Sequence, residues 1–197
     1  MNDLLERIAS DDAPTLSRLQ AELARRADRA GALDVAYRTV DSPVGTLLLA
    51  ATTDGLVRVA FEGEGHDAVL DELARAVSPR VLHAPFRLDA AALQLDEYFA
   101  GDRRTFDVPV DLRLATGFRR HVLAHLRTIP FGATESYAIV ARAAGSPNAV
   151  RAVGTACALN PVPLVVPCHR VVRSDGTVGQ YRGGVDAKRV LLALEAA

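Results

Sequence analysis

Cys168 stands among residues that could make it a nucleophile. His169 and Arg170 follow it directly in the segment Pro167-Cys168-His169-Arg170, and the apolar run Pro163-Leu164-Val165-Val166 before it predicts a short buried strand. Neighbouring cations favour the thiolate, which is the reactive form of cysteine, so this setting predicts a thiol with a lowered pKa. The alternative is a buried structural cysteine, which is the commoner role of this residue type.

Residues 112–197 predict a helical unit around this segment. Apolar residues recur at helical spacing, and glycine and proline separate the periodic runs. The predicted helices are Gly117–Arg127, Ser136–Ala144 and Pro147–Leu159. Gly145 suits the position after a helix, whereas Ser146 and Pro147 suit the N-cap and the first position of the next one. One helix therefore ends and another begins within about three residues, as in a helix-turn-helix.

The third predicted helix carries two distinct faces. Val150, Val153 and Cys157 are predicted to pack inward, and the other face carries Arg151, Gly154, Thr155 and Ala158. Small residues let a helix backbone approach another surface closely. This second face therefore fits a DNA groove, which the Arg151 side chain would enter first. An ordinary surface helix of an all-α subdomain is the alternative interpretation.

Residues 35–111 predict a small α+β unit, in which Asp54-Gly55 forms a hairpin turn. The predicted strands are Val35–Val40, Gly45–Thr52, Leu56–Phe61 and Thr105–Val110, and the predicted helices are Asp67–Ala76 and Ala90–Phe99. Residues 1–34 predict a polar helical extension that Asp11, Asp12 and Pro14 interrupt. No function is assigned to this extension.

Charge is distributed unevenly along the 197 residues. The net charge is −1, but residues 1–111 carry 12 Arg against 20 Asp and Glu, a net charge of −8. Residues 112–197 carry 10 Arg and 1 Lys against 4 Asp and Glu, a net charge of +7. This split favours an anionic partner for the C-terminal unit alone, although a plain solvated surface would give the same pattern.

Composition excludes several classes of protein. With 49% hydrophobic and 24% charged residues, the chain is neither disordered, collagen-like nor a coiled coil overall. No apolar run approaches the ~20 residues of a membrane span, and the N-terminus lacks the pattern of a secretory signal. Two cysteines are too few for a disulfide framework. We therefore expect a cytoplasmic protein, and the use of Arg for 22 of 23 cations hints at a bacterial source.

From Phe118 to Glu195 the chain resembles the O6-alkylguanine-DNA alkyltransferases, also called methylated-DNA–protein-cysteine methyltransferases. The segments that carry the resemblance are Ser136-Tyr137, Arg151–Gly154, Asn160–Pro163, Pro167–Val172, Gly179–Gly184 and Leu191–Glu195. The unit from Val35 resembles the first domain of that family more loosely. The resemblance implies an α+β protein with a small α/β N-terminal domain at 35–111, after the extension at 1–34. A helical C-terminal domain with a helix-turn-helix follows at 112–197.

The resemblance implies direct DNA repair at Cys168. This residue would take the alkyl group irreversibly from a flipped-out O6-alkylguanine, once per molecule, and O4-alkylthymine is a second substrate that the family allows. His169 would deprotonate Cys168 through a water, and Glu195 would hold His169. Asn160 would order the turn before the active-site strand, and Tyr137 would donate to the leaving base. From position alone, Glu195 is as consistent with a frayed, solvated terminal residue.

The resemblance also assigns the residues that contact DNA and the base. Arg151 would enter the duplex and fill the gap left by the flipped nucleotide, while Tyr137 would crowd the phosphate. The DNA face includes Gly154 and Thr155, and the base pocket includes Val171, Tyr181, Arg182 and Cys157. Two positions depart from the family pattern: Cys157 replaces another small or apolar residue, and Arg182 stands where some relatives carry a small one. We expect Cys157 to pack rather than react, and a disulfide with Cys168 is not expected in a reducing compartment.

Chemistry agrees with these roles. The base must leave the duplex to be reached, and displacement at a saturated carbon needs a strong, soft nucleophile such as thiolate. The departing guanine anion needs a proton donor, which a tyrosine can supply.

No cofactor or metal is expected. There is no glycine-rich phosphate loop, residues 1–111 contain no cysteine, and His121 and His125 lack an evident third metal ligand. The expected partner is double-stranded DNA carrying alkylated guanine, bound by a monomer with no membrane contact, and cooperative binding stays open. Two rival functions remain: a non-catalytic sensor of damaged bases, against which Cys168 argues, and a cysteine hydrolase.

Overall fold

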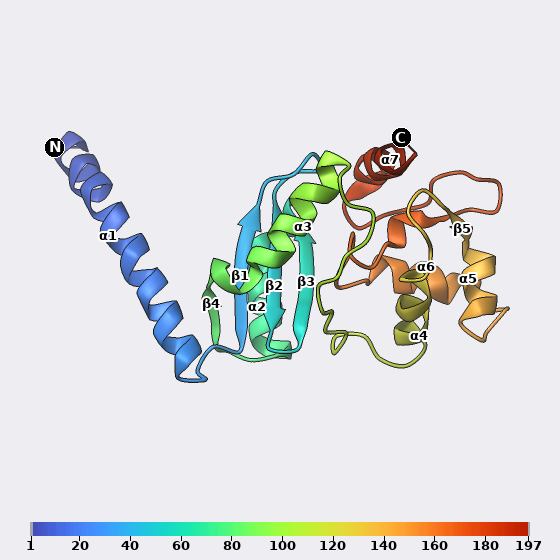
Figure 1. Ribbon diagram of the computed structural model, residues 1–197, viewed down its shortest axis with the longest axis horizontal. Coiled ribbons are helices and arrows are strands. Elements are labelled where there is room, and N and C mark those ends of the chain that lie inside the picture. Colours follow the sequence, from blue (N-terminus) through green and yellow to red (C-terminus); the bar gives the residue numbers. More distant parts are fainter. Residues whose placement is uncertain (1, 197) are drawn as a thin grey trace.

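The computed structural model describes residues 2–196, in which a four-stranded sheet forms the centre of the N-terminal half (Figure 1). The strand order is β3-β2-β1-β4. The strands are β1 (Val35–Val40), β2 (Leu47–Thr52), β3 (Gly55–Phe61) and β4 (Val81–His83). The pairs β1–β2 and β2–β3 are antiparallel, whereas β4 runs parallel to β1. The predicted hairpin is confirmed, with Thr52 paired to Gly55 across a two-residue loop.

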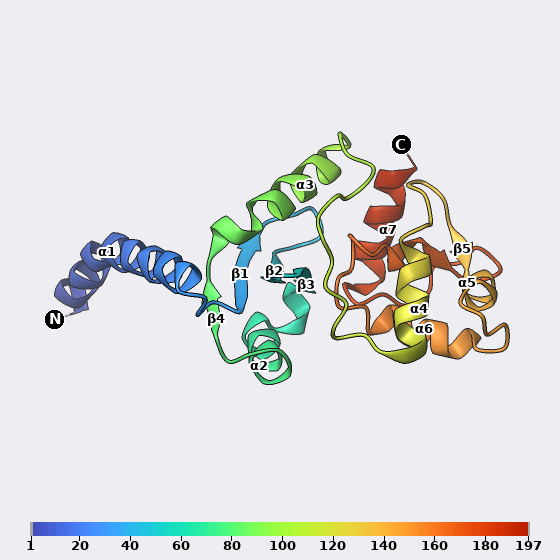
Figure 2. The same ribbon diagram turned by 60° about the horizontal axis from the view of Figure 1, so that its bottom comes forward.

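Two helices cover opposite faces of this sheet, α2 (His66–Ala76) and α3 (Asp89–Ala100) (Figure 2). Every residue of β2 is buried, and its side chains alternate between the faces. Leu48 and Ala50 belong to the core with Val69 and Leu73 of α2. The intervening Leu47 and Leu49 belong to the larger core that includes α3 and the C-terminal helices. Both predicted helices are therefore confirmed, and the sheet joins them into one α+β unit.

The strand predicted at Thr105–Val110 is wrong. Only Val110 makes a strand-like pair, with Leu56, and the fourth strand is the three-residue Val81–His83, which is too short to show a sequence period. Pro109 lacks an N–H for a strand ladder, but its carbonyl accepts the Leu56 amide at 2.8 Å. A side chain at Gly55 would lie 2.4 Å from this carbonyl oxygen, so the close approach requires glycine.

The extension forms one helix, α1 (Asn2–Arg29), which projects away from the sheet (Figures 1 and 2). The break expected at Asp11, Asp12 and Pro14 is wrong, because a proline removes one helical hydrogen bond without necessarily ending the helix. The C-terminal turns of α1 hold it to the body: Ala24 is buried, and Arg87 contacts Asp28 at 2.6 Å.

The C-terminal half is helical, as predicted. Its helices are α4 (Gly117–Leu126), α5 (Tyr137–Ala143), α6 (Val150–Ala158) and α7 (Gly184–Glu195), and a small parallel sheet joins β5 (Glu135–Ser136) to β6 (Val171–Val172). Ser136 caps α5 by accepting the Ile139 amide at 3.3 Å. Gly145 ends the same helix with φ +81°, the left-handed conformation expected at this position. No helix among residues 2–196 has the length and apolar character needed to cross a membrane.

The start of the third predicted helix is wrong by three residues. Ser146 donates its amide to Ala141 and so completes the end of α5, and its carbonyl accepts from Ala149 in a turn. The helix α6 therefore begins at Val150, and this residue is exposed instead of packing inward. The inward face consists of Val153, Ala156 and Cys157.

Candidate active site

Cys168 opens a single 3₁₀ turn, Cys168–Arg170, after a buried turn at residues 161–167. The short strand predicted at Pro163–Val166 is wrong, because prolines in this segment lack the amides that a strand ladder needs. The amide of Val166 donates instead to Val162 at 2.9 Å. This turn leaves Cys168 only 1% exposed.

Asn160 holds this turn together from inside. Its Nδ2 donates to the carbonyl of Val166 at 2.8 Å and to the Sγ of Cys168 at 3.2 Å, and its Oδ1 accepts the amide of Val162 at 3.1 Å. The side chain is fully buried, so each of these bonds forms without competition from water. The position of the sulfur is therefore fixed by a side chain from the end of α6.

The expected lowering of the Cys168 pKa is wrong. Burial raises the pKa of this thiol to about 11, although the hydrogen bond from Asn160 and the charges of Lys188 and Arg182 oppose the shift. Sequence adjacency shows the cations but not the loss of solvent, which here outweighs them. The resting thiol is neutral at pH 7 and needs a base to become a nucleophile.

His169, the next residue along the chain, has the chemistry of such a base. Its Nε2 lies 2.8 Å from Oε1 of Glu195, and both side chains are buried. Burial lowers the pKa of His169, partly offset by Glu195, so the imidazole is neutral at pH 7. Its Nδ1 is buried and makes no hydrogen bond to any residue of 2–196. A neutral ring whose Nε2 proton is held by Glu195 leaves Nδ1 as the nitrogen that accepts a proton.

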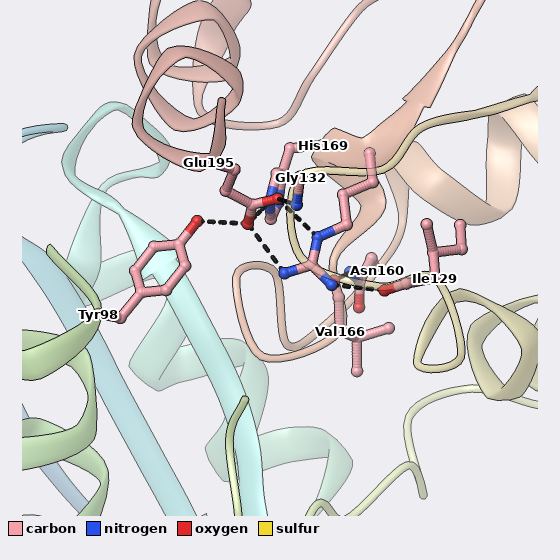
Figure 3. A network of polar contacts seen from close by, with 8 residues as sticks. Tyr98, Ile129, Gly132, Asn160, Val166, His169 and Glu195 are labelled. Atoms are coloured by element: carbon pink, nitrogen blue, oxygen red, sulfur yellow. Dashed lines mark hydrogen bonds and ion pairs between the residues drawn. The ribbon is translucent and has the colours of Figure 1, made fainter. Parts of the chain in front are cut away.

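Glu195 is the centre of a buried polar network (Figure 3). It accepts from Tyr98 Oη at 2.7 Å, from Arg170 Nε and Nη2 at 2.8 and 2.9 Å, and from the Gly132 amide at 3.2 Å. Burial alone would raise the pKa of Glu195, but the hydrogen bonds from His169 and Arg170 lower it to about 2. The frayed, solvated alternative for Glu195 is therefore wrong.

Three of the four predicted DNA-contacting residues, Tyr137, Arg151 and Gly154, lie around one cavity of about 350 Å³. Tyr137, Val150, Arg151, Gly154, Ala158, Arg173, Gly179 and Gln180 line it. Thr155 is exposed on the same helix but does not line the cavity. A side chain at Gly179 would lie 2.5 Å from Tyr137 Oη, so this glycine makes room for the phenol. Burial and the two thiols raise the pKa of Tyr137, which keeps its proton available for donation.

The predicted base-pocket residues come from several elements. Val171 is buried in β6, and its carbonyl accepts from Lys188 Nζ at 2.5 Å. The ring of Tyr181 packs edge-on against His169, with centroids 6.3 Å apart. Cys157 is buried and unbonded to Cys168, and burial raises the pKa of its thiol well above the usual range.

Three buried residues near Cys168 were missed by the sequence reasoning. Lys188 looks like a surface residue on an amphipathic helix, and Tyr98 looks like part of an apolar core face. Arg170 was expected only to favour the thiolate, whereas it forms an ion pair with Glu195 and donates to the Ile129 carbonyl at 2.6 Å. Each has a charged or polar residue directly beside it in the sequence, so no local pattern marks any of the three as buried.

Comparison with known proteins agrees with this arrangement. Residues 35–112 match the family model "6-O-methylguanine DNA methyltransferase, ribonuclease-like domain", and residues 117–197 match the model "6-O-methylguanine DNA methyltransferase, DNA binding domain". The chain belongs to the 6-O-methylguanine DNA methyltransferase family.

Individual members of this family are similar over most of their length. A methylated-DNA–protein-cysteine methyltransferase of Mycolicibacterium paratuberculosis is 41% identical over 161 residues, which cover 82% of this chain and 92% of that protein. A crystal structure of the Mycobacterium tuberculosis O6-methylguanine methyltransferase is 40% identical, with a TM-score of 0.73 over 82% of this chain and 93% of that one. The Mycobacterium tuberculosis protein in complex with DNA has a TM-score of 0.71 at 40% identity, over 82% and 92% of the two chains.

The two segments matched by the family models meet at the active site. Tyr98, from α3 in the first segment, bonds to Glu195 at the end of the second. The amide of Val59 in β3 donates to the carbonyl of Pro161 at 2.8 Å, next to Asn160. The first segment therefore supports the active site of this methyltransferase-family protein directly.

The histidine pair on α4 has a simple structural explanation. His125 Nε2 lies 2.7 Å from Oε2 of Glu135, whereas His121 is exposed. Across residues 2–196 there is no group of three or more His, Cys, Asp or Glu side chains arranged to hold a metal ion.

Proposed function

We propose that this protein repairs duplex DNA directly, by accepting the alkyl group of O6-alkylguanine on Cys168. O4-alkylthymine is a second substrate of the same site. The observation that carries the proposal is the buried Cys168, whose sulfur is held by Asn160 beside the His169–Glu195 pair. Residues 112–197 form the alkyl-acceptor and DNA-binding domain, 35–111 form the supporting domain, and 1–34 form an extension. The protein acts as a monomer in the bacterial cytoplasm, where both cysteines stay reduced.

The reaction is a displacement at the alkyl carbon. The thiol proton of Cys168 passes through a water to Nδ1 of His169, and the resulting imidazolium is stabilised by Glu195. The sulfur then forms a bond to the alkyl carbon, the bond from that carbon to O6 breaks, and its electron pair stays on the guanine. Tyr137 donates a proton to this leaving base and recovers one from His169. The products are unmodified guanine and an S-alkyl cysteine, so each molecule reacts once.

DNA binding is assigned to the face of α6 around the cavity. Arg151 is exposed there, Gly154 and Ala158 allow close approach of a backbone, and the C-terminal half has a net charge of +7. Phosphate contacts therefore supply most of the affinity, and the modified base is extruded past Tyr137 towards Cys168. Arg151 takes the place of the extruded base in the stack.

Replacing Arg151 with alanine should slow repair of duplex DNA far more than reaction with the free modified base. We expect a loss of roughly 100-fold on duplex, because the side chain offsets an unstacking cost of a few kcal/mol. The loss on free base should stay within about threefold, since no stack is opened. Single-turnover rates on both substrates test this, with Arg75→Ala on α2 as an exposed arginine control. Equal losses on the two substrates would exclude a role for Arg151 in base extrusion.

The rate of transfer should change little between about pH 8 and about pH 6.5 and should fall at lower pH. The pKa of His169 is lowered by burial, so the imidazole stays able to accept the thiol proton over that range and loses this ability once it is protonated. In His169→Ala, the thiolate must form by loss of a proton to solvent. Because the pKa of Cys168 is about 11, the fraction of thiolate falls as the pH is lowered. The rate of this variant should therefore fall about tenfold for each unit by which the pH is lowered. The same steep slope in the unaltered protein would show that His169 is not the base.

The deciding experiment is the mass of the protein after reaction with a duplex that carries O6-methylguanine. We expect one methyl group per molecule, mapped by peptide analysis to Cys168, and no further turnover. A sensor of damaged bases would bind the duplex without gaining mass. A cysteine hydrolase would process many substrate molecules and return to its original mass.

A further inference from the structure

An ion pair joins the N-terminal half to the segment that follows the active site. Glu64 lies in the 3₁₀ turn Glu62–Glu64 directly after β3, and its Oε2 accepts from Nε of Arg182. The same oxygen accepts from Nη2 of Arg58 at 2.5 Å. Arg182 lies 118 residues further along the chain, so this contact depends on how the two halves pack.

The carboxylate of Glu64 is held in one place by the strand beside it. Its Oε1 accepts the amide of Phe61 at 2.9 Å. The Arg58 side chain is 2% exposed, and its Nη1 donates to the carbonyl of Val59 at 2.6 Å and, at 3.4 Å, to that of Pro161. Glu64 therefore presents a fixed negative charge to the neighbouring segment.

Residues 181–183 pack closely between this corner and the active site. The Phe61 ring packs edge-on against Tyr181, with centroids 5.5 Å apart, and a side chain at Gly183 would lie 2.6 Å from that ring. On its other side Tyr181 packs against His169. Tyr181 therefore places this segment beside the 3₁₀ turn Cys168–Arg170. The segment forms a wall next to that turn, here called the 181–183 wall, and Phe61 and Glu64 of the N-terminal half hold it there.

We propose that Glu64 is a positioning residue that restricts the alkyl pocket to small groups, because its ion pair with Arg182 keeps the 181–183 wall close to Cys168. Arg182 is 24% exposed, so without its carboxylate partner it can turn towards solvent and open the pocket. The inference rests on the proposed function and specifies its substrate class: O6-methylguanine is accepted much faster than O6-alkylguanines with bulky groups.

The test compares one duplex sequence carrying either O6-methylguanine or O6-benzylguanine. In Glu64→Gln, we expect the rate with the benzyl group to rise at least about tenfold, and the rate with the methyl group to stay within about threefold. The control is Glu62→Gln, an exposed carboxylate in the same 3₁₀ turn, which should leave the ratio of the two rates unchanged. A general loss of stability would lower both rates together and would not move this ratio.

A double-mutant cycle tests whether Glu64 acts through Arg182. Arg182→Gln removes the other partner of the Glu64–Arg182 ion pair and leaves Arg58 bonded to Glu64. If Glu64→Gln fails to fold, this variant still tests whether the ion pair controls the rate ratio. It should shift the rate ratio in the same direction, and Glu64→Gln should add nothing in its presence. An unchanged ratio in the folded variants, or fully additive shifts, would overturn the inference. If the unaltered protein transfers neither group, the proposed function fails instead.

Discussion

Replacement of Cys168 with alanine is expected to reduce alkyl transfer to below about one thousandth of the unaltered rate, because no other residue of the site can accept the alkyl group. DNA binding should stay within about threefold, since the face of α6 that we propose as the DNA-binding surface is untouched. The sulfur has one side-chain hydrogen bond, from Asn160, and the alanine variant keeps the other two bonds of that amide. Intact-mass analysis and a binding titration on the same duplex measure the two effects.

The matched control is Cys157→Ala, at the penultimate residue of α6. Cys157 is buried and has no base beside it, and burial keeps its thiol protonated. Methyl transfer should stay within about threefold of the unaltered rate in this variant, since only packing changes. Residual transfer in Cys168→Ala, or an alkyl mark on Cys157 in a substantial fraction of molecules, would contradict the assignment of Cys168 as the acceptor.

Glu195→Gln is expected to lower both the rate and the stability. The amide cannot stabilise the imidazolium of His169, so we expect transfer to slow roughly 100-fold. The buried guanidinium of Arg170 also loses its carboxylate partner, which should cost about 3 kcal/mol of unfolding free energy. Chemical denaturation at pH 7 and single-turnover kinetics measure the two losses.

The pH dependence of stability separates this effect from simple mispacking. The pKa of Glu195 is about 2 in the folded protein and about 4.5 in the unfolded chain, so its contribution is fully present above about pH 4.5 and is lost as the pH falls towards 2. Glu195→Gln should lack this component of acid destabilisation. Asp186→Asn, an exposed carboxylate in the first turn of the same helix, should behave like the unaltered protein. Identical acid profiles for Glu195→Gln and the unaltered protein would exclude the buried ion-pair role.

Local patterns in the sequence predicted most of the elements. Gly145 and Ser136 mark the ends of α5 correctly because capping depends on a few neighbouring residues. The start of α6 was misplaced because Ser146 has two possible uses, and tertiary packing selects the one that ends α5. The strand expected at Thr105–Val110 has suitable β-branched and apolar residues, but it has no partner strand beyond one residue pair.

The sequence named Cys168, Asn160, His169 and Glu195, which the structure brings together, but it did not show their electrostatics. The motif around Cys168 and the position of Glu195 follow from the resemblance, yet the direction of the Cys168 pKa shift depends on burial, which no local pattern shows. Tyr98 and Glu195 are 97 residues apart, so their hydrogen bond exists only in the folded chain. The partner of Arg182 was unpredictable for the same reason.

The hydrogen bonds that cross between the two halves restrict how this protein can evolve by recombination. Tyr98 completes the bonding of Glu195, and β3 bonds to the turn beside Asn160 through Val59 and Pro161. A chimera that takes residues 35–111 from a relative without Tyr98 would lose one hydrogen bond to the buried Glu195, although His169, Arg170 and the Gly132 amide would still bond to this carboxylate. We therefore expect a chimera to work best when both halves keep these cross-half hydrogen bonds.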